Sequence, residues 1–213
     1  MRDRSENQIT LVLIRHGATK ANQEQRYLGK TDEALTEEGK QELKEYMKRK
    51  FYPDIDCLFT SPMKRCVQTA KILYPKLQAV QMKEWKEMDF GEFEGKNYKE
   101  LKGDNRYQAW IDSNGILPFP EGESREKFIA RCVRGFQKMA EEVKQRKEKE
   151  EYKTIGVIVH GGTIMALLSK YGGGDYFDYQ VSNGKGYVCT MKNFDENPEL
   201  IEMKKIGWEM FGI

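Results

Sequence analysis

Two apolar segments of this chain each end in a histidine followed by glycine. Residues 9–14 are apolar except for Thr10 and lead into Arg15-His16-Gly17, and residues 155–159 lead into His160-Gly161-Gly162. Short, nearly uninterrupted apolar runs are typical of strands buried on both faces of a parallel sheet. Ligands bind beyond the carboxyl ends of such strands. The two histidines, which are the only ones in the chain, are therefore predicted to meet at one site.

The rest of the chain alternates between helix and strand signals. Thr36 is a typical N-cap for a helix that Pro53 would stop, and Ser61-Pro62 predicts the start of another. Ser124 begins the clearest helical periodicity. The expected helices cover residues 36–52, 62–74, 124–149 and 163–171, and the further strands cover 57–60, 79–82, 187–191 and 200–204, the last two as a possible antiparallel pair.

This alternation predicts the fold class. We expect one domain over residues 1–213, with a three-layer α/β/α architecture and a mostly parallel central sheet. Residues 83–123 are rich in glycine and proline. They are expected to form an irregular cap, with one or two short helices, over the C-terminal edge of the sheet.

Charge and cysteine usage argue against several classes of protein. The 36 Lys and Arg residues against 34 Asp and Glu leave a net charge of +2, which does not suggest a nucleic-acid partner. No apolar run approaches the ~20 residues of a membrane helix, and residues 1–8 lack a signal-peptide core. The cysteines are scattered, which predicts reduced core thiols in a cytoplasmic protein; they are Cys57, Cys66, Cys132 and Cys189.

Two arginines accompany the histidines. Arg15 directly precedes His16, and Arg65 falls in the first turn of the helix after Ser61-Pro62, where a cation opposes the helix dipole. Arginines beside a helix N-terminus form a site for a phosphate-sized anion. A metal site fits less well, because the arginines would repel a cation and no further histidine is available. No nucleotide-binding glycine motif is present, so no cofactor is expected.

Several sequence blocks resemble the histidine phosphatase superfamily, whose branches include phosphoglycerate mutases. The first is Leu11-Val12-Leu13-Ile14-Arg15-His16-Gly17-Ala18-Thr19-Lys20-Ala21-Asn22, in which Ala18 stands where an acidic or polar residue is common. Further similar blocks follow in the same order as in the family. They are Gly29, Asp32, Leu35-Thr36 and Gly39; residues 60–70; Glu87-Met88-Asp89-Phe90-Gly91; residues 120–124; and His160-Gly161-Gly162-Thr163.

The resemblance implies a role for each matching residue. His16 would be the nucleophile that forms a phosphohistidine, and Glu87 would be the general acid and later the base. Arg15, Arg65 and His160 would hold the phosphoryl oxygens, with Asn22, Gly161 and Gly29 as further binding residues. Desolvation by Phe90 and Phe93 would raise the pKa of Glu87. Asp89 is the substitute candidate for the acid.

The implied activity is hydrolysis of a small phosphomonoester without a metal ion. The main alternative is phosphoglycerate mutase-type transfer, but mutases of this family carry an Arg- and Tyr-rich segment after the acid, whereas this chain has Phe90-Gly91-Glu92-Phe93-Glu94. Within the phosphatases the chain most resembles alpha-ribazole phosphatases of cobalamin synthesis. A non-catalytic phosphate-binding module is the alternative from another class. Both a monomer and a homodimer remain open.

Overall fold

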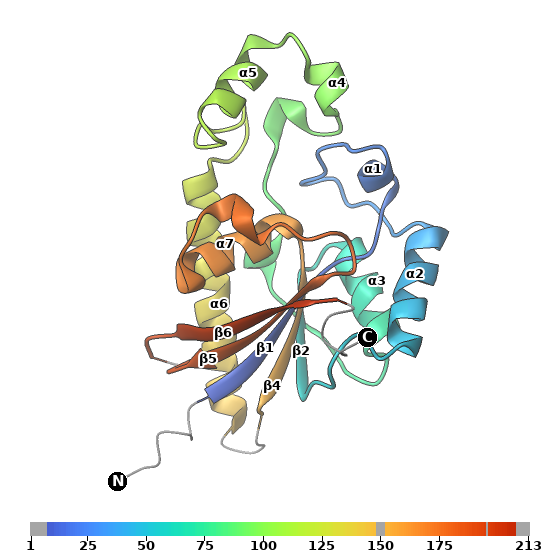
Figure 1. Cartoon of the computed structure of the whole chain (residues 1–213), viewed down its shortest axis with the longest axis vertical. Coiled ribbons are helices and arrows are strands. Elements are labelled where there is room, and N and C mark those ends of the chain that lie inside the picture. Colours follow the sequence, from blue (N-terminus) through green and yellow to red (C-terminus); the bar gives the residue numbers. More distant parts are fainter. Residues whose placement is uncertain (1–7, 148–151, 195, 208–213) are drawn as a thin grey trace.

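One mixed sheet forms the centre of the molecule (Figure 1). The computed structural model describes residues 8–147, 152–194 and 196–207, and within them six strands pair in the order β3-β2-β4-β1-β5-β6. The strands are β1 (Gln8–Arg15), β2 (Cys57–Thr60), β3 (Val80–Gln81), β4 (Thr154–Val159), β5 (Gly186–Lys192) and β6 (Glu199–Ile206). The pairs β1–β4, β4–β2 and β2–β3 are parallel, and β5 and β6 add antiparallel pairs at one edge. The predicted α/β class with a mostly parallel sheet is confirmed.

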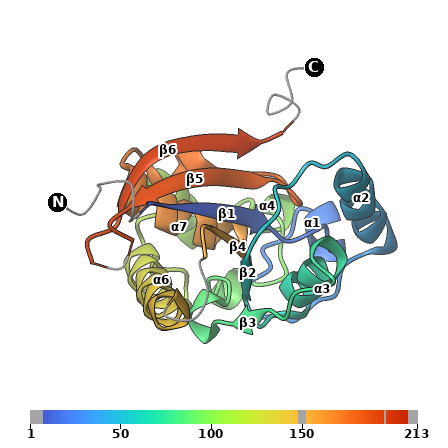
Figure 2. The same cartoon turned by 90° about the horizontal axis from the view of Figure 1, so that it is seen from below.

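Helices cover both faces of this sheet. Figure 2 shows α2 and α3 on one face and α6 and α7 on the other. Among the described residues the α-helices are α1 (Lys20–Gln23), α2 (Glu37–Lys48), α3 (Lys64–Leu73), α4 (Tyr98–Leu101), α5 (Asn105–Asp112), α6 (Arg125–Lys147) and α7 (Gly161–Gly172). Short 3₁₀ turns are η1 (Lys83–Trp85), η2 (Gly91–Phe93) and η3 (Tyr176–Tyr179). None of the helices described is both long and apolar enough to cross a membrane.

The two faces of β1 build two separate core regions. Leu11 and Leu13 pack with α6 and α7, whereas Val12 and Ile14 pack with α2 and α3. All four are almost completely buried. A strand buried on both faces has no need of alternating polar residues, which is why residues 9–14 read as an almost continuous apolar run.

Three helix boundaries differ from the prediction. Helix α2 ends at Lys48 and not at Pro53, because the chain turns at Lys50 with φ of 53°. Helix α3 begins at Lys64, two residues after the predicted Pro62. Ser61 Oγ accepts from the N–H of Met63 at 3.4 Å and also meets His160. Helix α7 begins at Gly161, two residues before Thr163. The predicted end of α6 near Lys149 lies outside the described residues.

The segment 83–123 contains two short α-helices, in agreement with the predicted one or two, and the 3₁₀ turns η1 and η2. Its short helices α4 and α5 lie beyond the sheet edge at the top of Figure 1. Asn97 and Asp104 cap them through side-chain acceptors, and these caps replace the support that a longer helix would supply. Trp110 and Phe119 belong to a cluster of aromatic rings that also includes Tyr27 from the loop after α1.

Candidate active site

The two histidines lie side by side at the carboxyl edge of the sheet. β1 and β4 are parallel neighbours in which Arg15 pairs with Val159, and the residue after each strand is a histidine. The backbone N–H of His16 donates to the carbonyl of Val159 at 2.9 Å. As a result the two imidazole centroids are 5.2 Å apart, in an edge-to-face arrangement.

A hydrogen bond fixes the proton of His16 on one ring nitrogen. Nδ1 lies 2.7 Å from the carbonyl oxygen of Gly17. Because a carbonyl only accepts, Nδ1 carries the proton and Nε2 keeps a free electron pair. A Cβ at Gly17 would lie 2.7 Å from Leu43 Cδ1, so a side chain at this position would have to displace Leu43. In the neutral imidazole, the hydrogen bond from Nδ1 therefore leaves Nε2 as the nucleophilic nitrogen.

His160 is held by Ser61 and Arg65. Its Nε2 lies 2.8 Å from Ser61 Oγ, and Arg65 Nε donates to its Nδ1 at 3.3 Å. An arginine can only donate, so Nδ1 is the acceptor and Nε2 carries the proton. All three side chains are completely buried, so this group is a rigid support behind the site.

The loop before α2 anchors the other side of Arg65. The guanidinium of Arg65 donates to the carbonyl oxygens of Gly29 at 3.0 Å and Thr31 at 2.8 Å. The backbone N–H groups of the same two residues donate to the Glu94 carboxylate. Gly29 is predicted as a substrate contact; in the structure its polar groups are engaged with Arg65 and Glu94, and contact with substrate stays a prediction.

Arg15 and Asn22 each present an unused donor. Arg15 Nη1 donates to the carbonyl of Val181 at 2.7 Å, but its buried Nε has no partner among the described residues. Asn22 Oδ1 accepts from Thr19 and from Asn183 Nδ2, the latter at 3.0 Å. This fixes the amide so that its nitrogen is the group available to a ligand.

Glu87 approaches from the segment between η1 and η2. One carboxylate oxygen accepts from the N–H of Met88 at 3.0 Å, and the other accepts from the N–H of Gly162 at 3.4 Å. A side chain at Gly162 would collide with this carboxylate. The N-terminus of α7 and Glu87 are thus packed directly against each other.

Arg131 of α6 fixes the segment that carries Glu87. Its guanidinium donates to the carbonyl oxygens of Glu84 at 2.7 Å, Lys86 at 2.8 Å and Glu87 at 3.3 Å. It also forms a two-pronged ion pair with Glu123. Because three carbonyl oxygens of the 84–87 segment are bound to one planar group, the position of the Glu87 side chain depends on Arg131.

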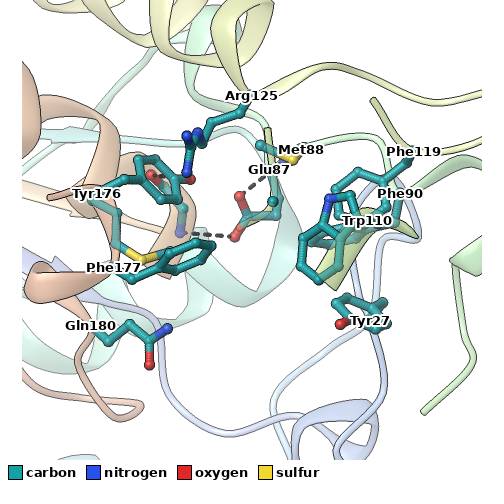
Figure 3. Close-up of a pocket in the computed structure, with 13 residues that line it drawn as sticks. Tyr27, Glu87, Met88, Phe90, Trp110, Phe119, Arg125, Tyr176, Phe177 and Gln180 are labelled. Carbon is teal, nitrogen blue, oxygen red and sulfur yellow. Dashed lines mark hydrogen bonds between the residues drawn. The ribbon is translucent and has the colours of Figure 1, made fainter. Parts of the chain in front are cut away.

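Two joined cavities open in front of these residues. We call the first, of about 260 Å³, the histidine cavity; Arg15, His16, Asn22, Glu87 and Gly161 are among its lining residues. The second, also of about 260 Å³, is the aromatic cavity (Figure 3). Its aromatic lining residues are Tyr27, Phe90, Trp110, Phe119, Tyr176 and Phe177. The residues that line both cavities are Tyr27, Glu87, Phe90, Gly162, Met165 and Gln180.

The structure therefore brings the predicted site residues together in two layers. Five of them line the histidine cavity. Arg65, His160 and Gly29 are not among the described residues that line it, and they lie in the supporting layer behind. Within the part of the chain that is described, no cluster of three or more His, Cys, Asp or Glu is placed to hold a metal ion.

Burial and the arginine charges shift the titration of the central groups. Desolvation, reinforced by Arg65 and Arg15, holds the pKa of His16 well below 6.5. Desolvation also lowers the pKa of His160, with Arg65 as the next cause. Desolvation raises the pKa of Glu87 above 4.5, although its backbone hydrogen bonds and the two arginines oppose this rise. A neutral nucleophile beside a carboxyl group that favours its protonated form is suited to phosphoryl transfer.

Sequence reasoning missed Ser61, Glu94, Asn183 and Arg131. Ser61 is predicted only as a helix cap, yet its Oγ meets His160. Asn183 lies in a loop with no periodic pattern, and its Nδ2 donates to the backbone oxygen of His16 at 3.0 Å. For Glu94 and Arg131 the chain offers no local signal, because their partners lie far away in the sequence.

Comparison with known proteins decides the family. The sequence model described as the histidine phosphatase superfamily (branch 1) matches residues 11–203. This chain belongs to the histidine phosphatase superfamily. The matched span includes every residue placed at the site above.

Members with different names resemble this histidine phosphatase. "Uncharacterized phosphatase PhoE" of Bacillus subtilis (strain 168) is 32% identical, with 78% of each chain covered. A 2,3-bisphosphoglycerate-dependent phosphoglycerate mutase of Buchnera aphidicola is 28% identical over 86% of this chain and 94% of the relative. The phosphatase and mutase branches therefore both have relatives of this chain.

Solved structures show the same fold. The alpha-ribazole phosphatase from Shigella flexneri superposes with a TM-score of 0.74 at 23% identity, over 91% of this chain and 95% of that one. Phosphoserine phosphatase from Entamoeba histolytica, solved with 3-phosphoglyceric acid, gives a TM-score of 0.69 at 26% identity, over 92% and 96%. The likeness to the first of these concerns the fold alone.

Proposed function

We propose that this histidine phosphatase hydrolyses a small-molecule phosphomonoester through a phosphohistidine at His16. The observation that carries the proposal is the fixed tautomer of His16 in the cavity that Glu87 also lines. The name of the Bacillus subtilis relative, a phosphatase, supports it. Covalent capture divides one difficult displacement into two easier steps.

In the first step His16 Nε2 attacks phosphorus while the bond to the leaving oxygen breaks. Glu87 in its protonated form transfers its proton to that oxygen, so the substrate leaves as a neutral alcohol. In the second step the Glu87 carboxylate takes a proton from water, whose oxygen bonds to phosphorus as the P–N bond breaks. Inorganic phosphate and neutral His16 result, and Glu87 is protonated again.

Positive charge and fixed donors stabilise the transferring group. Arg15 Nε, the Asn22 amide and the Gly161 N–H at the start of α7 are the proposed phosphoryl ligands. Arg65 adds positive charge from behind, and His160 holds its guanidinium in place. We propose that these groups replace the metal ion that other phosphatases use. The four cysteines are free and buried, which supports the proposed reducing, cytoplasmic location.

The first test is substrate turnover. We expect inorganic phosphate to be released from alpha-ribazole 5′-phosphate, because the sequence blocks most resemble alpha-ribazole phosphatases. Phosphoserine and 3-phosphoglycerate are measured beside it. Formation of 2-phosphoglycerate from 3-phosphoglycerate in the presence of 2,3-bisphosphoglycerate, without phosphate release, would favour the mutase alternative. Binding of phosphate with no turnover of any ester would favour the alternative of a non-catalytic phosphate-binding module.

The second test is removal of divalent ions. Because the proposed phosphoryl ligands are arginine, amide and backbone groups, kcat should be unchanged after dialysis against EDTA, as measured by phosphate release. Loss of activity that only a divalent ion restores would show that the positive charge has been assigned to the wrong groups.

Arg131 provides a third test, as a positioning residue for Glu87. Arg131→Met frees three backbone carbonyls of the 84–87 segment and should lower kcat on an alkyl phosphate by roughly 10–100-fold. An activated aryl phosphate, which leaves without a proton, should lose much less. Arg134→Met removes an exposed arginine from the same helix and is the matched control. Equal losses on both substrates would indicate a merely structural role.

A further inference from the structure

The aromatic cavity begins where the leaving group of the proposed reaction must be. Glu87, the proposed proton donor to the leaving oxygen, lines this cavity as well as the histidine cavity. In Figure 3 its carboxylate lies between two aromatic walls, with Tyr176 and Phe177 on one side and Trp110 and Phe90 on the other. A substrate whose phosphate occupies the histidine cavity would therefore place its alcohol portion between these walls.

The lining is too apolar for a small charged alcohol. Besides six aromatic residues it contains Met88 and Met165, and Glu87 and Arg125 are the only charged residues among the described residues that line it. Burying apolar substrate surface against such walls is favourable, and aromatic rings add an edge-to-face or stacking preference. A flat aromatic ring fits the chemistry of this cavity better than a hydroxy acid or an amino acid.

The aromatic walls are held in place by contacts within the protein itself. Trp110 and Phe119 have ring centroids 4.9 Å apart, and Phe90 and Phe119 are 5.0 Å apart. Gly115 lies where a Cβ would be 3.0 Å from Phe177 and 3.2 Å from Trp110, so the absence of a side chain at this position lets the two walls meet at one end. A preorganised slot loses little conformational entropy on binding.

Arg125 supplies a single cation at the edge of this slot. Its guanidinium carbon lies 5.4 Å from the Tyr176 ring centroid and 5.8 Å from that of Phe177, and Nη1 donates to the carbonyl of Asn114 at 3.0 Å. No carboxylate among the described residues forms an ion pair with it. The residue also opens α6, where a positive charge is unfavourable for the helix.

We propose that the aromatic cavity is a leaving-group subsite for phosphomonoesters whose alcohol bears a flat aromatic ring with an anionic group on its far edge. The rings would bind the flat face, and Arg125 would pair with the anionic group. This inference rests on the proposed function, because it identifies the leaving group of that reaction. It would also exclude phosphoserine as a preferred substrate, since a serine side chain reaches neither feature.

The test needs substrates of matched leaving ability. Hexyl phosphate, 2-naphthylmethyl phosphate and 6-carboxy-2-naphthylmethyl phosphate all release a primary alcohol, so differences in kcat/KM report binding of the alcohol portion. We expect naphthylmethyl phosphate to exceed hexyl phosphate by about 10-fold or more. The carboxylate of 6-carboxy-2-naphthylmethyl phosphate should raise kcat/KM by a further factor of roughly 5–10, because it forms a partly desolvated ion pair with Arg125.

Two variants separate the two features. Arg125→Met keeps an apolar stem against Tyr176 and Phe177. It should remove the increase in kcat/KM that the carboxylate gives. Phe177→Leu thins one wall and should reduce the naphthylmethyl-to-hexyl ratio. Ratios within one variant do not depend on how much of it is folded. Arg106→Met, which removes an exposed arginine that pairs with Asp104 and Glu92 on the same cap, should change neither ratio.

Each outcome has a separate meaning. Equal kcat/KM for hexyl and naphthylmethyl phosphate in the wild-type protein would overturn the subsite while leaving the phosphatase intact. A carboxylate increment that survives Arg125→Met would overturn the assignment of Arg125. If the protein released phosphate from no ester at all, including p-nitrophenyl phosphate, the proposed function would fail and the inference would fail with it.

Discussion

His16→Ala should abolish turnover of every phosphomonoester, with kcat reduced by at least about 10⁴-fold. The reason is that His16 carries the only imidazole among the described residues that line the histidine cavity. Loss of a covalent nucleophile in other hydrolases costs this much or more. Phosphate release measured with p-nitrophenyl phosphate checks the result.

A binding measurement keeps this variant informative. Arg15, Asn22 and the start of α7 remain in His16→Ala, so inorganic phosphate should still bind, as titration calorimetry would show. Retained phosphate binding with lost turnover separates loss of the nucleophile from loss of the fold. Substantial turnover by this variant would mean that the covalent mechanism is wrong.

Glu87→Gln should damage the enzyme in proportion to the basicity of the leaving group. The amide oxygen can still accept from Met88 or Gly162, but no proton is available for the leaving oxygen. For an alkyl phosphate we expect a loss of about 10²–10⁴-fold, the usual worth of general acid catalysis. An aryl phosphate should still phosphorylate His16 and then hydrolyse slowly, which gives a burst of the aryl alcohol in stopped-flow measurements.

The pH dependence of activity is a second test of Glu87 as the general acid. Because the pKa of Glu87 is raised and its protonated form is required, activity on an alkyl phosphate should fall as pH rises through that pKa, and Glu87→Gln should lose this limb. Glu84→Gln is the matched control, since Glu84 pairs with Lys138 outside both cavities. Equal impairment of both substrate types would place the acid elsewhere, with Asp89 as the next candidate.

Much of the site geometry follows from the two strands that end in histidine. Buried parallel strands must be apolar on both faces, so β1 and β4 are visible in the sequence, and their adjacency brings His16 and His160 together. Arg15 and Arg65 follow from the same reasoning, because each stands next to a predicted strand end or helix start. These features depend on short-range patterns, and such patterns can be read along the chain.

Glu87 could not be selected by local pattern. It shares its neighbourhood with other glutamates, and only the family resemblance distinguishes it. The structure gives the physical difference: Glu84 pairs with Lys138 and Glu92 with Arg106, while Glu94 accepts backbone N–H groups from the 29–31 loop. Glu87 is the one whose carboxylate lines the cavities. Such partners come from long-range packing that a single sequence does not encode in its spacing.

The boundaries that differ have a similar cause. Ser61-Pro62 has the composition of a helix start, yet Ser61 Oγ is used by His160 and the helix begins at Lys64. In the cap, the formation of α4 and α5 depends on the capping residues Asn97 and Asp104 and on the aromatic cluster. A glycine-rich sequence gives little indication of such contacts.

Trapping the phosphoenzyme tests the central claim most directly. The wild-type protein and Glu87→Gln would be mixed with p-nitrophenyl phosphate, quenched at alkaline pH, at which phosphohistidine survives, and digested for mass spectrometry of the peptide that contains residues 11–20. We predict one added phosphoryl group on His16, accumulating more in Glu87→Gln because its hydrolysis is slowed. Burst kinetics with no phosphoryl group on His16, or with the group on any other residue, would contradict the account.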